Sequence, residues 1–114
     1  MSIKLAYTIQ FVSDMDHSIH FYRDVLGFNL LFQSPDWTEF ATGETRLALH
    51  PASQQNPSGK VQIGFHVDDL QEFFRTQSAQ GLRFTQAPKP EGRSTIARFV
   101  GPDGMEYSIS GEME

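Results

Sequence analysis

Residues 14–27, DMDHSIHFYRDVLG, and residues 68–81, DDLQEFFRTQSAQG, decide the fold of this chain. Each stretch opens with aspartate and closes with glycine thirteen residues later, and apolar side chains recur between them at helical spacing. Ser13 to Asp16 offer several N-cap oxygens to the first stretch, and Asp69 with Glu72 has the spacing of a capping box in the second. Glycine is the preferred residue just after a helix ends. The two stretches therefore predict two amphipathic helices of similar length.

The strands expected around these helices repeat in the same order. They lie near 5–12, 28–33, 37–42 and 45–50 in the first half, and near 61–67, 82–86, 95–100 and 105–110 in the second. A polar stretch rich in Pro and Ser, residues 51–60, joins the halves. Such an internal repeat predicts an α+β fold in which residues 1–114 form a single domain. Two tandem βαβββ modules, about 3–50 and 61–111, would curl their mixed sheets around a shared cavity.

Composition limits the partners and the location of the chain. The 114 residues carry a formal net charge of −5, which disfavours nucleic acid and anionic membranes as partners. Cysteine is absent, so disulfides, thiolate metal sites and cysteine nucleophiles are excluded. Residues 1–14 lack the apolar run of a signal peptide or a spanning helix. We therefore expect a cytoplasmic domain with neither a nucleic-acid nor a membrane partner.

Three motifs carry a resemblance to a known family. They are HSIHFYRDVLGFNL at 17–30, VDDL at 67–70 and GPDG at 101–104. Together they resemble the vicinal oxygen chelate superfamily, which includes glyoxalase I, extradiol dioxygenases, fosfomycin-modifying enzymes and bleomycin-binding resistance proteins. The resemblance spans essentially the whole chain and implies the same pair of βαβββ modules. It also implies a homodimer, in some relatives formed by exchange of modules.

The resemblance implies where a metal ion would be held. Its metal-dependent members use His, Glu or Gln at positions that match Tyr7, Gln62 and Ser108 here, and some add a ligand near Leu47 or Leu49. A serine hydroxyl is a poor ligand for Zn²⁺, Ni²⁺ or Fe²⁺, and a tyrosine binds only as phenolate. We therefore predict no metal ion and no other cofactor.

None of the four histidines is expected to replace the missing metal ligands. They are His17, His20, His50 and His66. His66 has the strand parity of Gln62 but lies roughly 13 Å further along the strand. His50 has the parity opposite to the fourth ligand position, so we expect it to face away from the cavity or to end the strand. The helical pair is interpreted as solvent-facing, and no serine has a histidine base placed beside it, so no catalytic residue is assigned.

Strand alternation nominates other side chains for the same cavity. Arg98 could contact a carboxylate or phosphate of a ligand, or pair with Glu106 across the hairpin, and the pairing is favoured. Trp37 could provide a stacking wall, or be buried in a core or a dimer interface. The stretch 86–94 could cover one mouth of the cavity or serve as a plain connector. The candidate ligand-binding residues are Tyr7, Gln62, Ser108, Arg98, Glu106, Trp37 and Glu39.

These observations leave three functions open. The favoured one is a metal-free homodimer that binds a small molecule, of unknown identity, in the sheet cavity. The second is a glyoxalase-like lyase, isomerase or dioxygenase with non-standard or misplaced metal ligands. The third is a scaffold or regulatory module that binds no ligand.

Overall fold

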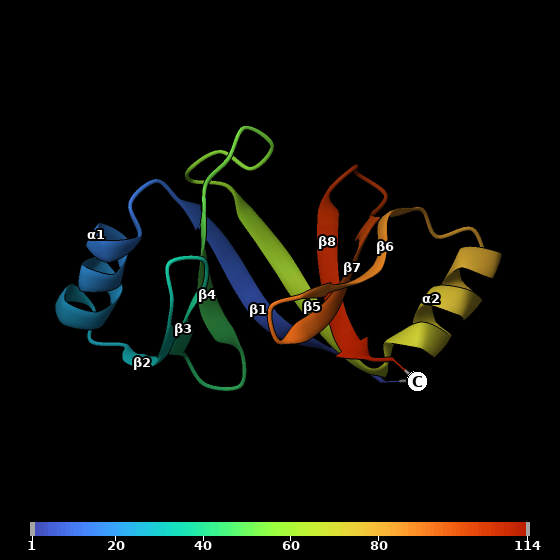
Figure 1. The fold of residues 1–114 in the computed structure, drawn as a ribbon, viewed down its shortest axis with the longest axis horizontal. Coiled ribbons are helices and arrows are strands. Elements are labelled where there is room, and N and C mark those ends of the chain that lie inside the picture. The colour runs from blue at the N-terminus through green and yellow to red at the C-terminus, as the bar shows by residue number, and fades with distance from the viewer. Residues whose placement is uncertain (1, 114) are drawn as a thin grey trace. The chain divides into compact units, whose positions relative to one another are not determined.

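The structure, a computed structural model, describes residues 2–113 and divides into two compact units (Figure 1). The first unit comprises Ala6–Gln62. The second comprises the chain from Ile63 onward together with the first residues of the chain up to Leu5. Each unit contains a helical segment and a four-stranded mixed sheet, so the predicted α+β fold with two βαβββ modules is confirmed.

The first unit begins with a strand, continues with a helix and ends with three further strands. Its elements are β1 (Ile3–Val12, of which the part from Ala6 belongs to this unit), α1 (Met15–His20), the π-helical turn η1 (Phe21–Val25), β2 (Asn29–Gln33), β3 (Thr38–Ala41) and β4 (Arg46–Pro51). The strand order is β2-β3-β4-β1, in which β1 and β4 run parallel and the other neighbours antiparallel.

The second unit repeats this plan. Its elements are β5 (Val61–Asp69), α2 (Leu70–Ala79), β6 (Phe84–Glu91), β7 (Ser94–Val100) and β8 (Glu106–Glu112). The order β6-β7-β8-β5, with β5 parallel to β8, matches that of the first unit. Whether the two sheets share a cavity stays a prediction.

The helices begin and end where the local sequence predicts. The Asp14 carboxylate accepts a hydrogen bond from the His17 amide at 3.0 Å, and Asp69 does the same for Glu72 at 2.9 Å. Gly27 and Gly81 follow the helices with φ of 79° and 98°, a conformation that favours glycine. The first helix differs from the expectation in one respect, because its last turn, η1, is π-helical.

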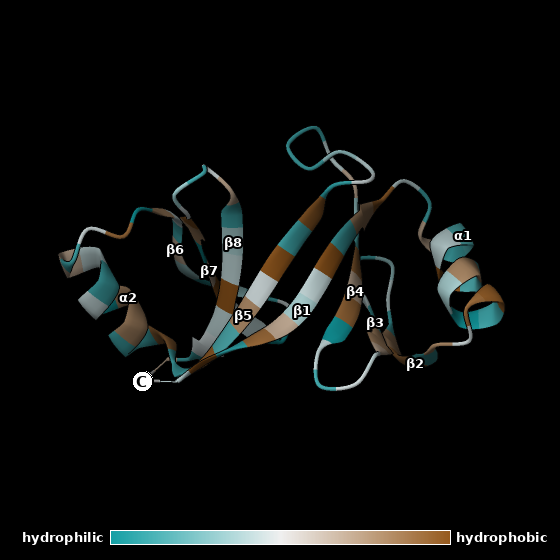
Figure 2. Cartoon of the chain, turned by 180° about the vertical axis from the view of Figure 1, so that it is seen from behind, coloured by the Kyte–Doolittle hydropathy of each residue, from teal (hydrophilic) through white to brown (hydrophobic). Residues whose placement is uncertain are grey.

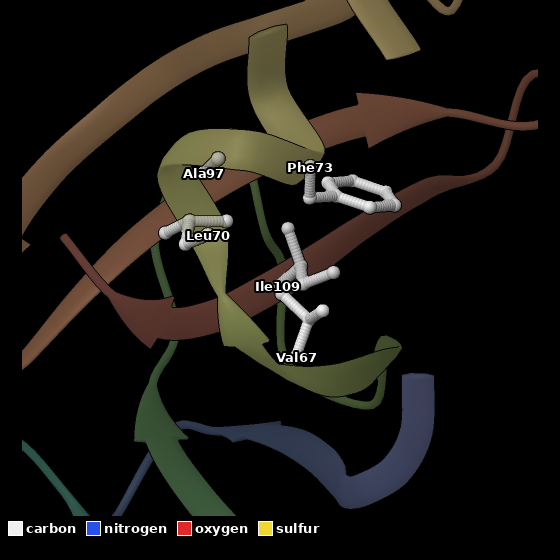
Figure 3. Packing of buried hydrophobic residues seen from close by; sticks show 5 residues of the cluster. All are labelled: Val67, Leu70, Phe73, Ala97 and Ile109. Carbon is white, nitrogen blue, oxygen red and sulfur yellow. The ribbon is translucent and has the colours of Figure 1, made fainter. Parts of the chain in front are cut away.

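Packing of the second unit is centred on the helix-covered side of its sheet. Val67, Leu70, Phe73, Ala97 and Ile109 are all buried, and Figure 3 shows them meeting between α2 and the strands. In the first unit, Ile19 of α1 packs in the same way against Val12, Phe40 and Leu49. Figure 2 shows the matching alternation of polar and apolar residues along β1 and β5.

One glycine is required by space and not by backbone conformation. A Cβ atom on Gly111 would lie 2.3 Å from the Val67 carbonyl oxygen and 2.9 Å from the Leu70 Cβ. The register between β5 and β8 shifts at this point, between the pairs His66–Ser110 and Asp69–Glu112. The absence of a side chain at Gly111 lets β8 pass the beginning of α2.

The stretch 86–94, expected to be a loop, is mostly strand. β6 continues to Glu91 through Pro88 and Pro90, and its partner β7 begins at Ser94. Proline is compatible with a strand at the edge of a sheet, where one side of the strand needs no amide donors. β6 is the outer strand of its unit, so the interpretation of this stretch as a plain connector is wrong, and whether it covers a cavity stays a prediction.

Neither α1 nor α2 in the described part of the chain has the length and apolar character needed to cross a membrane.

Candidate functional site

The sheet face of the first unit opposite α1 carries a polar and aromatic group, here called the Glu39 cluster: Tyr7, Trp37, Glu39, Arg46 and His50. The Tyr7 and Trp37 rings meet edge to face with centroids 5.6 Å apart. Trp37 Nε1 donates a hydrogen bond of 2.6 Å to one Glu39 oxygen, and Arg46 donates one of 2.7 Å to the other. Both carboxylate oxygens therefore have a partner, and Trp37 is held in one orientation.

The Tyr7 phenol is stabilised in its neutral form. Burial raises the pKa of Tyr7 above its usual value of 10.0, and the negative charge of Glu39 raises it further. Arg46 acts in the opposite direction but does not reverse the shift. At neutral pH Tyr7 is thus a neutral phenol, and the phenolate that a metal ion requires is disfavoured.

His50 lies on the face where it was not expected. Its ring lies 5.3 Å from that of Phe11 and 6.3 Å from that of Trp37, measured between centroids. Leu47 and Leu49 pack instead with the cluster on the α1 side. The parallel register of β1 and β4 pairs Phe11 with His50, so the two side chains lie on the same face of the sheet. The sequence was interpreted to place His50 on the opposite face from Tyr7, which is wrong. His50 Nδ1 lies 2.9 Å from the Pro51 carbonyl oxygen and donates a hydrogen bond to it.

Gln62 and Ser108 are both buried polar residues, with exposed fractions of 3% and 7%. Gln62 lies at the start of β5. Ser108, in β8, pairs with Gly64 on one side and with Arg98 on the other. The alternation that put Ser108, Arg98 and Glu106 on one sheet face of the second unit agrees with this register.

Arg98 is held by two residues of the neighbouring strand β6. It donates to the Gln86 amide oxygen at 2.5 Å and forms an ion pair with Glu91 at 3.1 Å. Burial raises the pKa of Glu91, but hydrogen bonds from Gln86 and Arg98 outweigh it, so the pKa is lowered overall. The sequence favoured pairing of Arg98 with Glu106, whereas the ion pair seen here joins Arg98 to Glu91. Glu106 accepts a hydrogen bond of 2.6 Å from Thr85.

A histidine and a serine that the sequence left apart lie side by side in the second unit. His66 Nδ1 is 3.0 Å from Ser110 Oγ, because the parallel register of β5 and β8 sets the two residues opposite each other. Ser110 Oγ also lies 3.4 Å from the Phe65 carbonyl. Within residues 2–113, no carboxylate is bonded to His66 to orient it as in a catalytic triad.

The donor set does not fit the divalent ion that the family resemblance implies. The three matched positions offer a phenol with a raised pKa, a buried amide and a buried hydroxyl. Such ions prefer imidazole and carboxylate ligands in sites of this type. Among residues 2–113, no three His, Asp or Glu side chains come together in a way that would hold a metal ion.

Comparison with known proteins agrees with the fold. Residues 4–109 match the family model described as the Glyoxalase/Bleomycin resistance protein/Dioxygenase superfamily. A bleomycin resistance protein from Klebsiella pneumoniae is 30% identical over 101 residues, covering 80% of this chain and 79% of the relative. A lactoylglutathione lyase from Haemophilus influenzae is 27% identical over 123 residues, covering 94% and 91%. A hypothetical protein from Bacillus halodurans C-125 has a TM-score of 0.82 and 20% identity, covering 100% and 97%.

Two βαβββ units with a polar and aromatic sheet face define a protein of the glyoxalase type, in which a common scaffold carries different sites. The chain belongs to the Glyoxalase/Bleomycin resistance protein/Dioxygenase superfamily. The solved structure establishes only the fold, because its identity to this chain is low. The two sequence relatives differ in function, so membership alone does not select an activity.

Proposed function

We propose that this protein binds a small organic molecule without a metal ion, and that the Glu39 cluster is part of the binding surface. The observation that carries the proposal is the environment of Tyr7. Burial and Glu39 keep its phenol protonated at a position where the metal-dependent members that the chain resembles use His, Glu or Gln. The residue is thus suited to hydrogen bonding and ring contact with a ligand.

The chemistry of the cluster favours a ligand with a flat or cationic part. Trp37 and Tyr7 present a ring edge and a ring face at a fixed angle of 77°. Aromatic faces attract cations and stack with planar groups. Glu39 supplies negative charge next to them, partly offset by Arg46. The similarity to a bleomycin resistance protein supports a binding role of this kind.

Trp37 is the only tryptophan, so its fluorescence reports on the cluster directly. We would titrate the protein with metal-free bleomycin and with a panel of aromatic cations while following Trp37 emission. Saturable quenching is expected for at least one compound, together with a raised melting temperature. Glu39→Gln should weaken the binding, and Glu44→Gln, an exposed carboxylate in the same unit, should not.

Metal content of the purified protein provides the second test. Less than about a tenth of an equivalent of Ni²⁺, Zn²⁺, Mn²⁺ or Fe²⁺, with no stabilisation when the ion is added, is expected if the proposal is right. One equivalent of bound ion that raises the melting temperature would overturn it.

An enzyme is the alternative that a particular observation favours. His66 and Ser110 form a hydrogen-bonded pair, and a lactoylglutathione lyase is among the relatives. Incubation with lactoylglutathione, followed by mass spectrometry, tests this reading. Conversion that is lost in His66→Gln and retained in His17→Gln, on the exposed part of α1, would favour the enzyme.

We propose a homodimer whether the protein binds a ligand or acts as an enzyme, to be tested by light scattering.

A further inference from the structure

The second unit contains a pocket that lies away from the polar sheet face. It has a volume of about 710 Å³ and is lined chiefly by Phe65, Phe73, Leu82, Arg83, Phe99 and Tyr107, which we call the aromatic pocket. Phe65, Phe73, Leu82 and Phe99 belong to the core on the α2 side of the sheet, whereas Ser108 and Arg98 point to the other side. The aromatic pocket is therefore separate from the Glu39 cluster and from the Arg98 network.

The walls of the aromatic pocket are rings that support one another. Phe65 and Phe99 are stacked with centroids 6.3 Å apart and an interplanar angle of 15°. The Tyr107 ring lies beside both of them, with its centroid 5.5 Å from that of Phe65 and 5.6 Å from that of Phe99. Phe73 meets Phe99 at 6.0 Å from the α2 side. A volume of this size lined by such rings is typical of a site for a small organic ligand.

The rim of the aromatic pocket is fixed by backbone hydrogen bonds. The Val100 amide donates to the Arg83 carbonyl at 3.0 Å, and the Gly101 amide donates to the Met105 carbonyl at 2.9 Å. Gly101 also allows close approach of Tyr107, because a Cβ atom there would lie 2.8 Å from the ring carbon Cε2. The pocket is thus formed before any ligand arrives, which reduces the entropy lost on binding.

Two hydrogen-bond donors of the aromatic pocket have no partner in the described part of the chain. They are the Tyr107 hydroxyl and the guanidinium of Arg83, an exposed residue. The other arginines with a described ion pair, such as Arg75 and Arg98, have carboxylate partners. A cation and a phenol left unpaired beside an apolar cavity are complementary to an acidic group on an otherwise apolar molecule.

We propose that the aromatic pocket binds a small amphipathic carboxylate, with its apolar body among the rings and its carboxylate on Arg83 and Tyr107. The planar guanidinium matches the two oxygens of a carboxylate. A neutral apolar molecule would leave both donors without a partner.

The test uses 2-naphthoate and its neutral analogue 2-naphthamide, which share a ring system and differ in charge. Calorimetry should show one site per chain, with naphthoate bound about three- to tenfold more tightly than naphthamide, because the ion pair with Arg83 is only partly shielded from water. Amide NMR shifts of the naphthoate complex should be largest at the lining residues of the aromatic pocket.

Variants show which side chains cause the difference in affinity between naphthoate and naphthamide. Arg83→Gln should bring the two affinities to within about twofold of each other. Arg75→Gln, which removes an arginine of α2 outside the pocket, should keep the wild-type ratio. Tyr107→Phe should reduce the ratio and leave the naphthamide affinity nearly unchanged, because the ring remains.

Three results would overturn the proposal. They are no binding of naphthoate at millimolar concentration, equal affinities for the two compounds in the wild type, and NMR shifts centred outside the aromatic pocket. The proposal would also be overturned if naphthoate failed to bind because a second copy of the chain fills the aromatic pocket. None of these results bears on the Glu39 cluster, whose ligand binding is read separately from Trp37 emission.

Discussion

Gly111→Ala is expected to destabilise the protein strongly, although it adds a single methyl group. The new Cβ would lie 2.3 Å from the Val67 carbonyl oxygen, where ordinary van der Waals contact begins at 3.4 Å. It would also lie 2.9 Å from the Leu70 Cβ and 3.2 Å from the Leu70 nitrogen. Two of these three atoms belong to the backbone, and the third is attached directly to it. No change of side-chain rotamer can therefore relieve the clash.

Relief requires that β8 move away from the beginning of α2. Overpacking of this kind costs about 1–3 kcal/mol when side chains can adjust, so a fixed backbone places Gly111→Ala near the upper end, at about 3 kcal/mol. For a domain of this size the melting temperature should fall by roughly 10–15 °C. Val67 and Leu70 also belong to the buried core of the unit, so their packing would be disturbed together.

Urea unfolding followed by circular dichroism measures the effect, with Glu112→Ala as the control. Glu112 is the next residue of β8 and is exposed, so its replacement should change the free energy of unfolding by no more than about 0.5 kcal/mol. A variant that fails to fold agrees with the reasoning. A Gly111→Ala protein within about 0.5 kcal/mol of the wild type would refute the close approach of β8 to α2.

Three further changes test individual interactions. Asp69→Ala removes the cap of α2 and should cost about 1 kcal/mol, measured by the same urea unfolding; an unchanged midpoint would contradict the capping bond. Glu39→Gln removes a negative charge next to Tyr7 and should lower its pKa, which the tyrosine ring-carbon NMR signal reports; a pKa that rises would show that the electrostatic argument is wrong. Because the folded pKa of Glu91 is lowered, its contribution to stability is present above its unfolded pKa and lost as pH falls through the folded value. Arg98→Gln should therefore flatten the acid limb of the stability profile, and an unaltered limb would argue against the ion pair.

Features set by neighbouring residues could be predicted from the sequence. Both helix caps and both terminating glycines lie within a few residues of the backbone groups they serve. Eight strands were also found, because alternation and turn residues are local signals. Two local features were missed: the π-helical form of the Phe21–Val25 turn, which no residue in it indicates, and the continuation of β6 to Glu91.

Features set by the pairing of distant strands could not be predicted. The side on which His50 lies depends on the register of β4 against β1, and a shift of one residue reverses it. His66 and Ser110 are 44 residues apart in the chain and meet only through the pairing of β5 with β8. Glu91 was not considered as a partner of Arg98, because β6 was expected to end before it.

The two outer strands of the units have opposite capacities to accept another strand. β6 contains Pro88 and Pro90, which cannot offer amide hydrogens to a strand laid beside them. β2, the other outer strand, reads NLLFQ and contains no proline. Polymerisation by edge-to-edge strand addition needs two receptive edges on each molecule, and this chain has one. Pairing through β2 would therefore stop at two copies and could not propagate into a fibre.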